Sequence, residues 1–311
     1  DAFTVKILPF LGEYSWSVVI ASLILSFCVA AVLIGGVKRI ASVSQIIVPF
    51  MAVIYFVFAV ILICCNITKV PAAFATIVTA AFSPKAITGG AVGSMLIAMQ
   101  KGVARGIFSN EAGLGSAPIA AAAAQTNSPV RQGLVSMTGT FIDTIIICTL
   151  TGLSIVLTGA WQVEGLEGVQ VTTYAFQHGL PFPAQFSSFI LMLCLVFFAF
   201  TTILGWDYYS ERCLEYLSGG NMKHVKIFRW IYILAVFIGP YMTVSAVWTI
   251  ADIFNGLMAI PNMIALFALS GVIVKETRAF FQHAKEEARA EHRSFEEVCE
   301  ENLNEEEAPA N

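Results

Sequence analysis

Six stretches of this chain are apolar over about 20 residues or more, and no other feature limits its possible folds so strongly. A helix of that length spans the hydrocarbon core of a bilayer, where only helices and closed barrels satisfy their backbone hydrogen bonds. Hydrophobic residues make up 57% of the sequence and charged residues 12%, which excludes an ordinary soluble domain. We therefore predict an all-α integral membrane protein with spans at 15–36, 44–65, 133–161, 184–206, 227–248 and 249–274.

A seventh crossing is predicted at 89–126, and it is interrupted by polar residues. Its centre reads GIFSNEAGLGSAPIAAAAAQT, from Gly106 to Thr126. At 1.5 Å per residue the segment is too long for one straight helix, so we predict a short helix, a break and a second helix. Irregular polar backbone is tolerated at membrane depth only where it packs against protein or borders a water-filled cavity. Such an interrupted segment is the best pointer in a sequence to the binding site of a transporter.

Basic residues predict the orientation of the spans. Lysine and arginine collect in cytoplasmic loops, and here they are concentrated in alternate loops, at Lys38, Arg39, Arg131, Arg212, Lys223, Lys226, Arg229, Lys275 and Arg278. With seven spans the chain then starts outside and ends in the cytoplasm, as a multi-pass protein of the cell (inner) membrane. The short apolar segment 71–82 is predicted to lie along the outer interface.

The chain divides by composition into a transmembrane transporter domain, 1–274, and a charged cytoplasmic tail, 275–311. The tail carries eleven acidic and five basic residues and sets the net charge of −4. We expect a solvated amphipathic helix at 276–307, without a specific partner. The sequence begins at Asp1 with no signal segment before the first span, so we expect the start of the protein to be missing.

The break at Asn110–Gly113 is the strongest candidate site. An unwound helix frees carbonyl groups that bind Na⁺ and amide groups that bind a carboxylate. Gly113 and Gly115 let backbone approach a ligand closely, and Pro118 suits the first turn of a resuming helix. A plain packing kink is the alternative, but it does not require Ser109, Asn110 and Glu111 beside it.

Further polar residues within the apolar runs are candidates for ion binding or gating. Arg105 is expected to pair with Glu111 or Asp143, or to meet solvent in an outward vestibule. For Asp143, proximity to Na⁺, pairing with Arg105 and protonation are all open. Thr201 and Thr202, with the carbonyl of Phe198 one turn back, offer hard oxygen ligands for Na⁺, or else bond back to their own helix. Trp206 is either an interface anchor or a cavity wall, and Asp252 with Asn255 fits a gate or a solvated helix start.

No signature of an enzyme occurs in the sequence. It lacks GxSxG, Walker A and metal-spaced His/Cys motifs, and its seven cysteines show no CxxC spacing. We expect neither enzymatic activity nor a nucleic-acid partner.

Four segments closely resemble the sodium:alanine symporter family, whose members carry alanine or glycine with Na⁺. They are GVARGIFSNEAGLGSAPIAAAAA, VRQGLVSMTGTFIDTIIICTLTGL, FAFTTILGWDYYSERCLEYL and ADIFNGLMAIPNMIALFALSGVIVK. That family is similar in fold to the amino acid–polyamine–organocation transporters, which have five-plus-five inverted repeats with broken first and sixth helices. The resemblance implies helices four to ten here, lacking the first helices and the half of each site that they supply.

Carried over by residue, the resemblance implies a secondary active symporter that couples inward Na⁺ flux to uptake of a small neutral amino acid by alternating access. It places substrate at Phe108, Ser109, Asn110, Glu111, Gly113, Gly115 and Trp206. It places Na⁺ at Thr201 and Thr202, and the oxygen chemistry described above adds Phe198 and Asp143 to the candidate ligands. Relatives often have His where this chain has Ala121. The alternative is a non-transporting amino-acid sensor or a channel-like membrane protein. The preferred amino acid, the Na⁺ stoichiometry and H⁺ coupling through Asp143 or Glu111 stay open.

Overall fold

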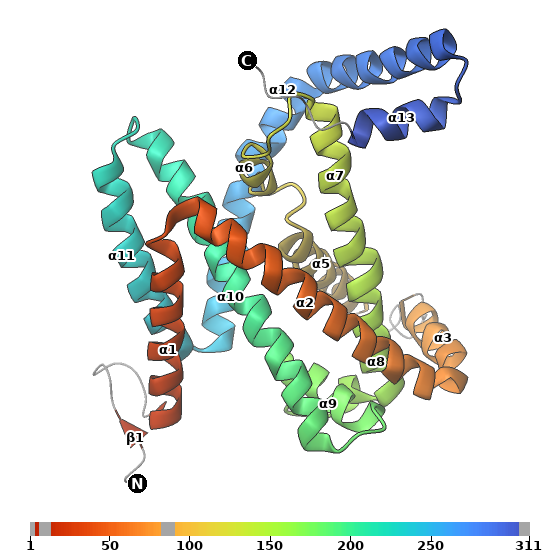
Figure 1. Cartoon of the computed structure of the whole chain (residues 1–311). Coiled ribbons are helices and arrows are strands. Elements are labelled where there is room, and N and C mark those ends of the chain that lie inside the picture. Colours follow the sequence, from red (N-terminus) through yellow and green to blue (C-terminus); the bar gives the residue numbers. More distant parts are fainter. Residues whose placement is uncertain (1–3, 6–13, 82–90, 305–311) are drawn as a thin grey trace. The chain divides into compact units, whose positions relative to one another are not determined.

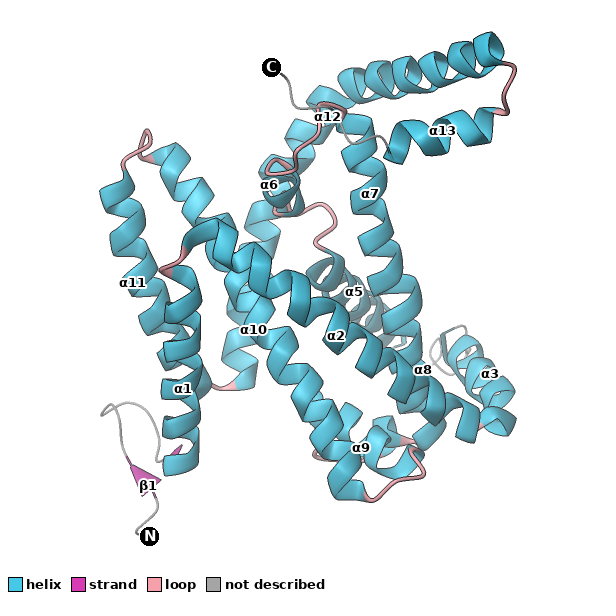
Figure 2. Cartoon of the chain, viewed as in Figure 1, coloured by secondary structure: helices cyan, strands magenta, loops and turns pink. Residues whose placement is uncertain are grey.

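The computed structural model describes residues 4–5, 14–81 and 91–304, and nearly all of them are helical (Figures 1 and 2). The two strands, β1 (Thr4–Val5) and β2 (Tyr14–Ser15), are two residues each and pair antiparallel. The chain forms two compact units, Asp1–Gln100 with Ile146–Ile250, and Lys101–Ile145 with Ala251–Asn311. The all-α class predicted from the sequence is confirmed.

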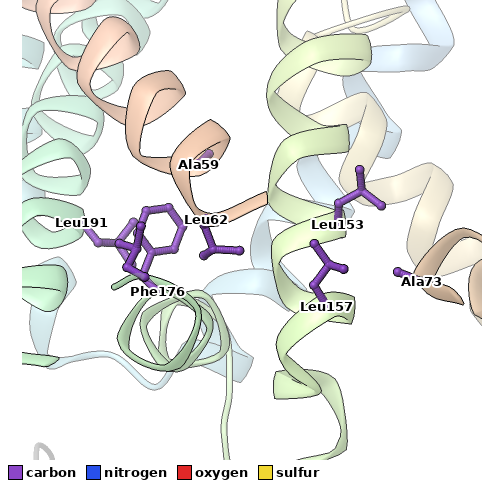
Figure 3. Packing of buried hydrophobic residues seen from close by; sticks show 8 residues of the cluster. Ala59, Leu62, Ala73, Leu153, Leu157, Phe176 and Leu191 are labelled. Atoms are coloured by element: carbon purple, nitrogen blue, oxygen red, sulfur yellow. The ribbon is translucent and has the colours of Figure 1, made fainter. Parts of the chain in front are cut away.

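The first unit is a set of helices packed around two long ones, α2 (Gly36–Cys65) and α10 (Ala184–Leu217). The other helices that lie wholly within this unit are α1 (Trp16–Leu33), η1 (Ile67–Lys69), α3 (Val70–Ala81), α8 (Cys148–Thr158), η3 (Ala160–Gln162), α9 (Val169–Gly179), α11 (Met222–Ile238) and η4 (Gly239–Tyr241). One buried cluster joins α2, α3, α8, α9 and α10 through Ala59, Leu62, Ala73, Leu153, Leu157, Phe176, Leu180 and Leu191 (Figure 3). A second cluster joins α1, α10 and α11 around Val29, Leu33 and Leu204.

The ends of these helices follow ordinary capping chemistry. The side chains of Ser15 and Asn221 accept hydrogen bonds from the backbone N–H groups two residues on, at the starts of α1 and α11. Gly159, in the left-handed conformation with φ 70°, ends α8. These local signals fix where the helices begin and end before any packing is considered.

The second unit contains the end of α5 (Ala91–Asn110), α6 (Ala117–Ala121), α7 (Pro129–Phe141), most of α12 (Val244–Glu291) and α13 (Phe295–Asn304). A π-helical turn, η2 (Ile142–Ile147), continues α7 into α8. In the tail, α12 and α13 pack together through Ala284, Ala288 and Val298. A reciprocal pair of backbone–side-chain bonds between Ser294 and Glu297 caps the start of α13, so the tail is two helices rather than the single predicted one.

In the described part of the chain, five helical segments are long and apolar enough to cross a membrane: Trp16–Leu33, Gly36–Cys65, Pro129–Thr158, Ala184–Leu217 and Val244–Ala290. The predicted span 227–248 differs from the structure, in which α11 begins at Met222 and ends at Ile238. Gly239 and Pro240 end the helix because proline lacks the N–H that a continuing helix needs. Thr243 then accepts a bond from the N–H of Ala246 at the start of α12. That α5 and α11 also cross the membrane remains a prediction.

Candidate functional site

The predicted break is present between α5 and α6. Regular helix stops at Asn110 and resumes at Ala117. Glu111, Gly113 and Gly115 all have left-handed backbone, with φ 56°, 79° and 80°. Glycine adopts this conformation at little cost, whereas Glu111 is held there against its preference. The resumed helix α6 is only five residues long, shorter than the second helix expected.

Side chains within the break hold its irregular backbone. The Asn110 Oδ1 atom accepts from the N–H of Ala112 at 2.9 Å, which caps a peptide group that the helix no longer satisfies. The Ser116 hydroxyl donates to Glu111 Oε2 at 2.7 Å, and Ser116 is buried. Leu114 is also buried and anchors the loop between the two glycines. Specific hydrogen bonds and two buried residues therefore hold the break in one conformation, unlike a loose kink.

The π-helical turn lies against the end of α5 and supplies its partners. The Ser109 hydroxyl lies 2.9 and 2.7 Å from the two oxygens of Asp143 and donates to that carboxylate. The Asn110 Nδ2 atom donates to the Thr144 hydroxyl at 3.1 Å. A π-helical turn displaces its side chains relative to an α-helix and recurs at functional sites. Asp143 is thus next to the break, as a candidate ion ligand should be.

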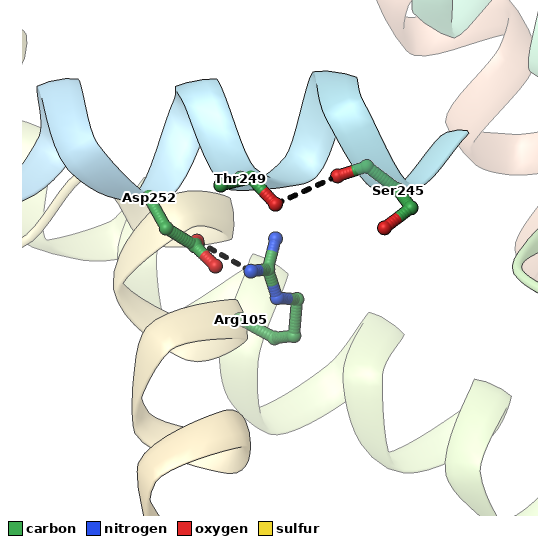
Figure 4. A network of polar contacts seen from close by, with 4 residues as sticks. All are labelled: Arg105, Ser245, Thr249 and Asp252. Atoms are coloured by element: carbon green, nitrogen blue, oxygen red, sulfur yellow. Dashed lines mark hydrogen bonds and ion pairs between the residues drawn. The ribbon is translucent and has the colours of Figure 1, made fainter. Parts of the chain in front are cut away.

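Arg105 forms an ion pair with Asp252 of α12 (Figure 4). The partners expected from the sequence, Glu111 and Asp143, are bonded instead to Ser116 and Ser109. Both members of the observed pair are about one-third exposed. The pair joins α5 to α12 within the second unit, and this pairing was outside the alternatives drawn from the sequence.

Gly115 lies close to Asn262 of α12. A Cβ atom at position 115 would come 3.0 Å from Asn262 Oδ1 and 3.1 Å from its Cγ. At Gly113, by contrast, an added Cβ would meet nothing within 4 Å. The close approach explains why a second glycine is needed in the break.

An open cavity of about 560 Å³ follows the break, between α6 and the start of α7. Small residues line it, with polar groups from Asn127, Ser128, Gln132 and Ser136. Pro118 and Ala121 of this lining are named in the sequence analysis, whereas the four polar residues are not. No group of three or more His, Cys, Asp or Glu residues that would hold a metal ion occurs in the described part of the chain.

The remaining candidate residues lie on α10, in the first unit. The Thr201 hydroxyl donates to the carbonyl oxygens of Phe197 and Phe198, at 3.0 and 3.1 Å. The Thr202 hydroxyl has no hydrogen-bond partner among the described residues, which leaves its oxygen available. Trp206 is half-buried and packs edge-on to Tyr209, with ring centroids 5.6 Å apart. Donation of the Thr201 proton leaves the lone pairs of its oxygen free, so both hydroxyls can offer an oxygen to a cation.

Sequence comparison places the chain in a family of membrane transporters. The model of the sodium:alanine symporter family matches residues 6–294, and the chain belongs to that family. Its relatives include an uncharacterized transporter of Haemophilus influenzae, 54% identical over 86% of this chain, and the sodium/alanine symporter AgcS of Methanococcus maripaludis, 46% identical over 87%. A sodium/proton-dependent alanine carrier protein of Bacillus sp. (strain PS3) is 37% identical over 76%. The matches cover 58%, 58% and 55% of these relatives, so the chain spans little more than half of their length.

Proposed function

We propose that this protein is a secondary active symporter, in which inward Na⁺ flux drives uptake of a small neutral amino acid, alanine or glycine, by alternating access. The hydrogen-bonded break between α5 and α6 is the observation on which the proposal rests. A packing kink does not need the separate hydrogen bonds found here: Ser116 to Glu111, Asn110 to the Ala112 N–H, and Ser109 to Asp143, around left-handed backbone.

Substrate binding is assigned to the break. Peptide N–H groups outside the helical ladder bind the carboxylate of an amino acid, and the carboxylates of Glu111 and Asp143 suit its ammonium group or a sodium ion. Phe108 in the second unit and Trp206 in the first are each proposed as an apolar wall for the substrate, and bulky walls that leave little room favour alanine or glycine over larger substrates. A relative named as a sodium/alanine symporter supports this substrate class.

Oxygen ligands for sodium are proposed in each unit by itself: Thr202, Thr201 and the Phe198 carbonyl in the first unit, and Asp143 in the second. Hard oxygen ligands of this kind suit a small cation. A relative named as sodium/proton-dependent also makes the proton a candidate second coupling ion. We further propose the five-plus-five inverted-repeat fold for the complete transporter, in the cell membrane with the tail in the cytoplasm.

The test is uptake of labelled alanine and glycine by the full-length protein in proteoliposomes, with and without an inward Na⁺ gradient. Accumulation that requires the gradient supports the symporter. Saturable binding of alanine without uptake would indicate a sensor, and flux that continues without a gradient and without saturation would indicate a channel.

Asn110 gives the sharpest test of the site itself. We expect Asn110→Ala to abolish uptake without loss of membrane insertion, since this side chain both caps Ala112 and bonds Thr144. Asn221→Ala is a matched control, because its side chain also accepts from a backbone N–H, at the start of α11 and not in the break. Near-normal uptake by Asn110→Ala would reduce the break to a packing kink.

A further inference from the structure

Asp207 of α10 is a buried carboxyl group without a hydrogen-bond or ion-pair partner of its own in the described part of the chain. The residue is 0% exposed, and neither of its carboxylate oxygens has a hydrogen-bond partner among the described residues. It follows Trp206 directly and lies five positions after Thr202 on the same helix. An ionised carboxylate in such a place is far more costly than a neutral one, because it loses its water and gains no donor.

The groups that could neutralise Asp207 are already engaged. Arg229 of α11 binds the Glu211 carboxylate through two bonds, Nε to Oε1 at 2.5 Å and Nη2 to Oε2 at 2.9 Å. The Glu211 side chain is 4% exposed and that of Arg229 is 19% exposed, so this pair is buried as well. The Tyr232 hydroxyl donates to the carbonyl of Ile203 at 2.8 Å and has no second proton to give. Two carboxylates thus share one guanidinium, and the cluster has one negative charge in excess unless Asp207 is neutral.

The described helices packed against α10 at this end bring no further counter-charge into the cluster. Helix α1 carries Cys28 as its titratable group, and that side chain is exposed. At the start of α2, Lys38 and Arg39 are exposed, and Arg39 donates to the carbonyl of Ala31. On α11, Lys223, His224 and Lys226 are also exposed. On α10 itself, Arg212 pairs with Glu215.

A proton suits this position better than a sodium ion does. A sodium ion needs several oxygen ligands, and the Glu211 oxygens and the Ile203 carbonyl each already accept a hydrogen bond, from Arg229 and Tyr232. The apolar cluster around Leu204 lies one turn earlier on the same helix. A proton needs no coordination shell and fits this enclosed position.

We propose that Asp207 is a proton-binding site, neutral while α10, α11 and α1 are packed as in this structure. Binding takes one proton from water onto the carboxylate, and release returns it. Because the packed arrangement holds the neutral acid, protonation favours this arrangement and ionisation favours one in which water reaches Asp207. Thr202 and Trp206 lie on the same helix, so the proton is linked to the region proposed for sodium and substrate. This last link, unlike the proton site itself, rests on the proposed function.

Infrared spectroscopy of the full-length protein in lipid tests the proton site without any transport assay. We expect the C=O stretch of a neutral carboxylic acid at neutral pH, lost in Asp207→Asn and retained in Glu215→Gln, whose carboxylate pairs with Arg212 on the same helix. Asparagine has the shape of the neutral acid and should be accommodated. Should that variant not fold, labelling aspartate with ¹³C in the unaltered protein must shift the band. A band unaffected by Asp207→Asn, or by the isotope, overturns the proposal.

Uptake across a pH series tests the link to transport. We expect Asp207→Asn to keep its Na⁺ requirement and to lose the pH dependence of alanine uptake that the unaltered protein shows. An unchanged pH dependence in the variant overturns the link. If the unaltered protein shows no uptake, the proposed function fails, while the infrared result still decides the proton site.

Discussion

At Gly115, backbone conformation and a close neighbour both require the absence of a side chain. The residue has φ 80°, and an added Cβ would lie 3.0 Å from Asn262. Gly113, two positions earlier, has the same backbone conformation but open space around it. Alanine variants at the two glycines therefore distinguish the free-energy cost of left-handed backbone from the added cost of contact with Asn262.

We expect Gly113→Ala to lower stability by about 1–2 kcal/mol, the cost of placing an L-residue in left-handed backbone. Gly115→Ala should lower it further, because Asn262 must also move. The thermal unfolding midpoint of the purified protein measures both. The double variant Gly115→Ala/Asn262→Ala should recover part of the difference, and equal losses for the two single variants would contradict the role assigned to Asn262.

The two hydroxyls on α10 make a second contrast between single residues. Thr201 bonds back to its own helix, whereas Thr202 makes no such bond among the described residues. If Thr202 ligates Na⁺, Thr202→Val removes one oxygen ligand and should weaken Na⁺ binding by about one to two orders of magnitude, at about 1.4 kcal/mol per tenfold. Alanine affinity at saturating Na⁺ should change far less.

Thr201→Val, at the other proposed hydroxyl ligand, should shift the Na⁺ concentration that gives half-maximal uptake in the same direction. Thr173→Val is the matched control, because the Thr173 hydroxyl bonds back to Val169 on α9 and is not assigned to the ion site. An unchanged Na⁺ midpoint in Thr202→Val would remove this residue from the ion site and leave Asp143 as the candidate.

At the scale of elements, α2, α8 and α9 meet closely at Gly179. A Cβ atom there would lie 2.7 Å from Leu62 Cγ and 2.8 Å from Thr158 Cγ2. The carbonyl of Gly179 also accepts a bond from Asn66 Nδ2 at 3.0 Å, which ties the end of α9 to the end of α2. The buried cluster of Figure 3 depends on this close approach.

Gly179→Ala should destabilise the first unit by about 1–3 kcal/mol, the usual cost of overpacking a well-packed core. Gly152→Ala on α8 is the control, because its Cβ would meet nothing within 4 Å and alanine is the better helix former. Thermal unfolding of both variants checks the expectation. Equal midpoints would show that Leu62 and Thr158 move aside without cost.

At the scale of the whole molecule, the distribution of basic residues predicts which ends of the helices face the cytoplasm. Gln282 in the tail half of α12 and Glu164 before α9 are both exposed, and we expect them on opposite sides of the membrane. In a protein without its native cysteines, Gln282→Cys should react with an impermeant thiol reagent only after the cells are opened. Glu164→Cys should react in intact cells. Labelling of both from the same side would refute the predicted orientation.

The sequence alone determined the class of the molecule and the place of its break. The length of an apolar segment is a local property of the sequence and predicts a membrane-spanning helix. A run of Ser, Asn, Glu and Gly inside such a segment is also local and predicts an interruption of the helix, independently of the helices packed around it. Proline and glycine ended α11 in the same local way, although the predicted span ran past Pro240 because hydrophobicity continues on both sides of it. Recognition of the family rested on the same local pattern.

Only the tertiary structure decided which polar groups meet. Arg105 and Asp252 are 147 positions apart, and Ser109 and Asp143 are 34 apart, so no spacing in the sequence pairs them. The π-helical turn that presents Asp143 and Thr144 has no clear sequence signal, since its residues are those of an ordinary apolar helix. Asp207 directly follows the predicted span 184–206, and only the packing of neighbouring helices buries it beside the ion pair of Glu211 and Arg229. Partner choice and burial depend on how helices pack, and the free energy of a charge depends on that packing more than on its neighbours along the chain.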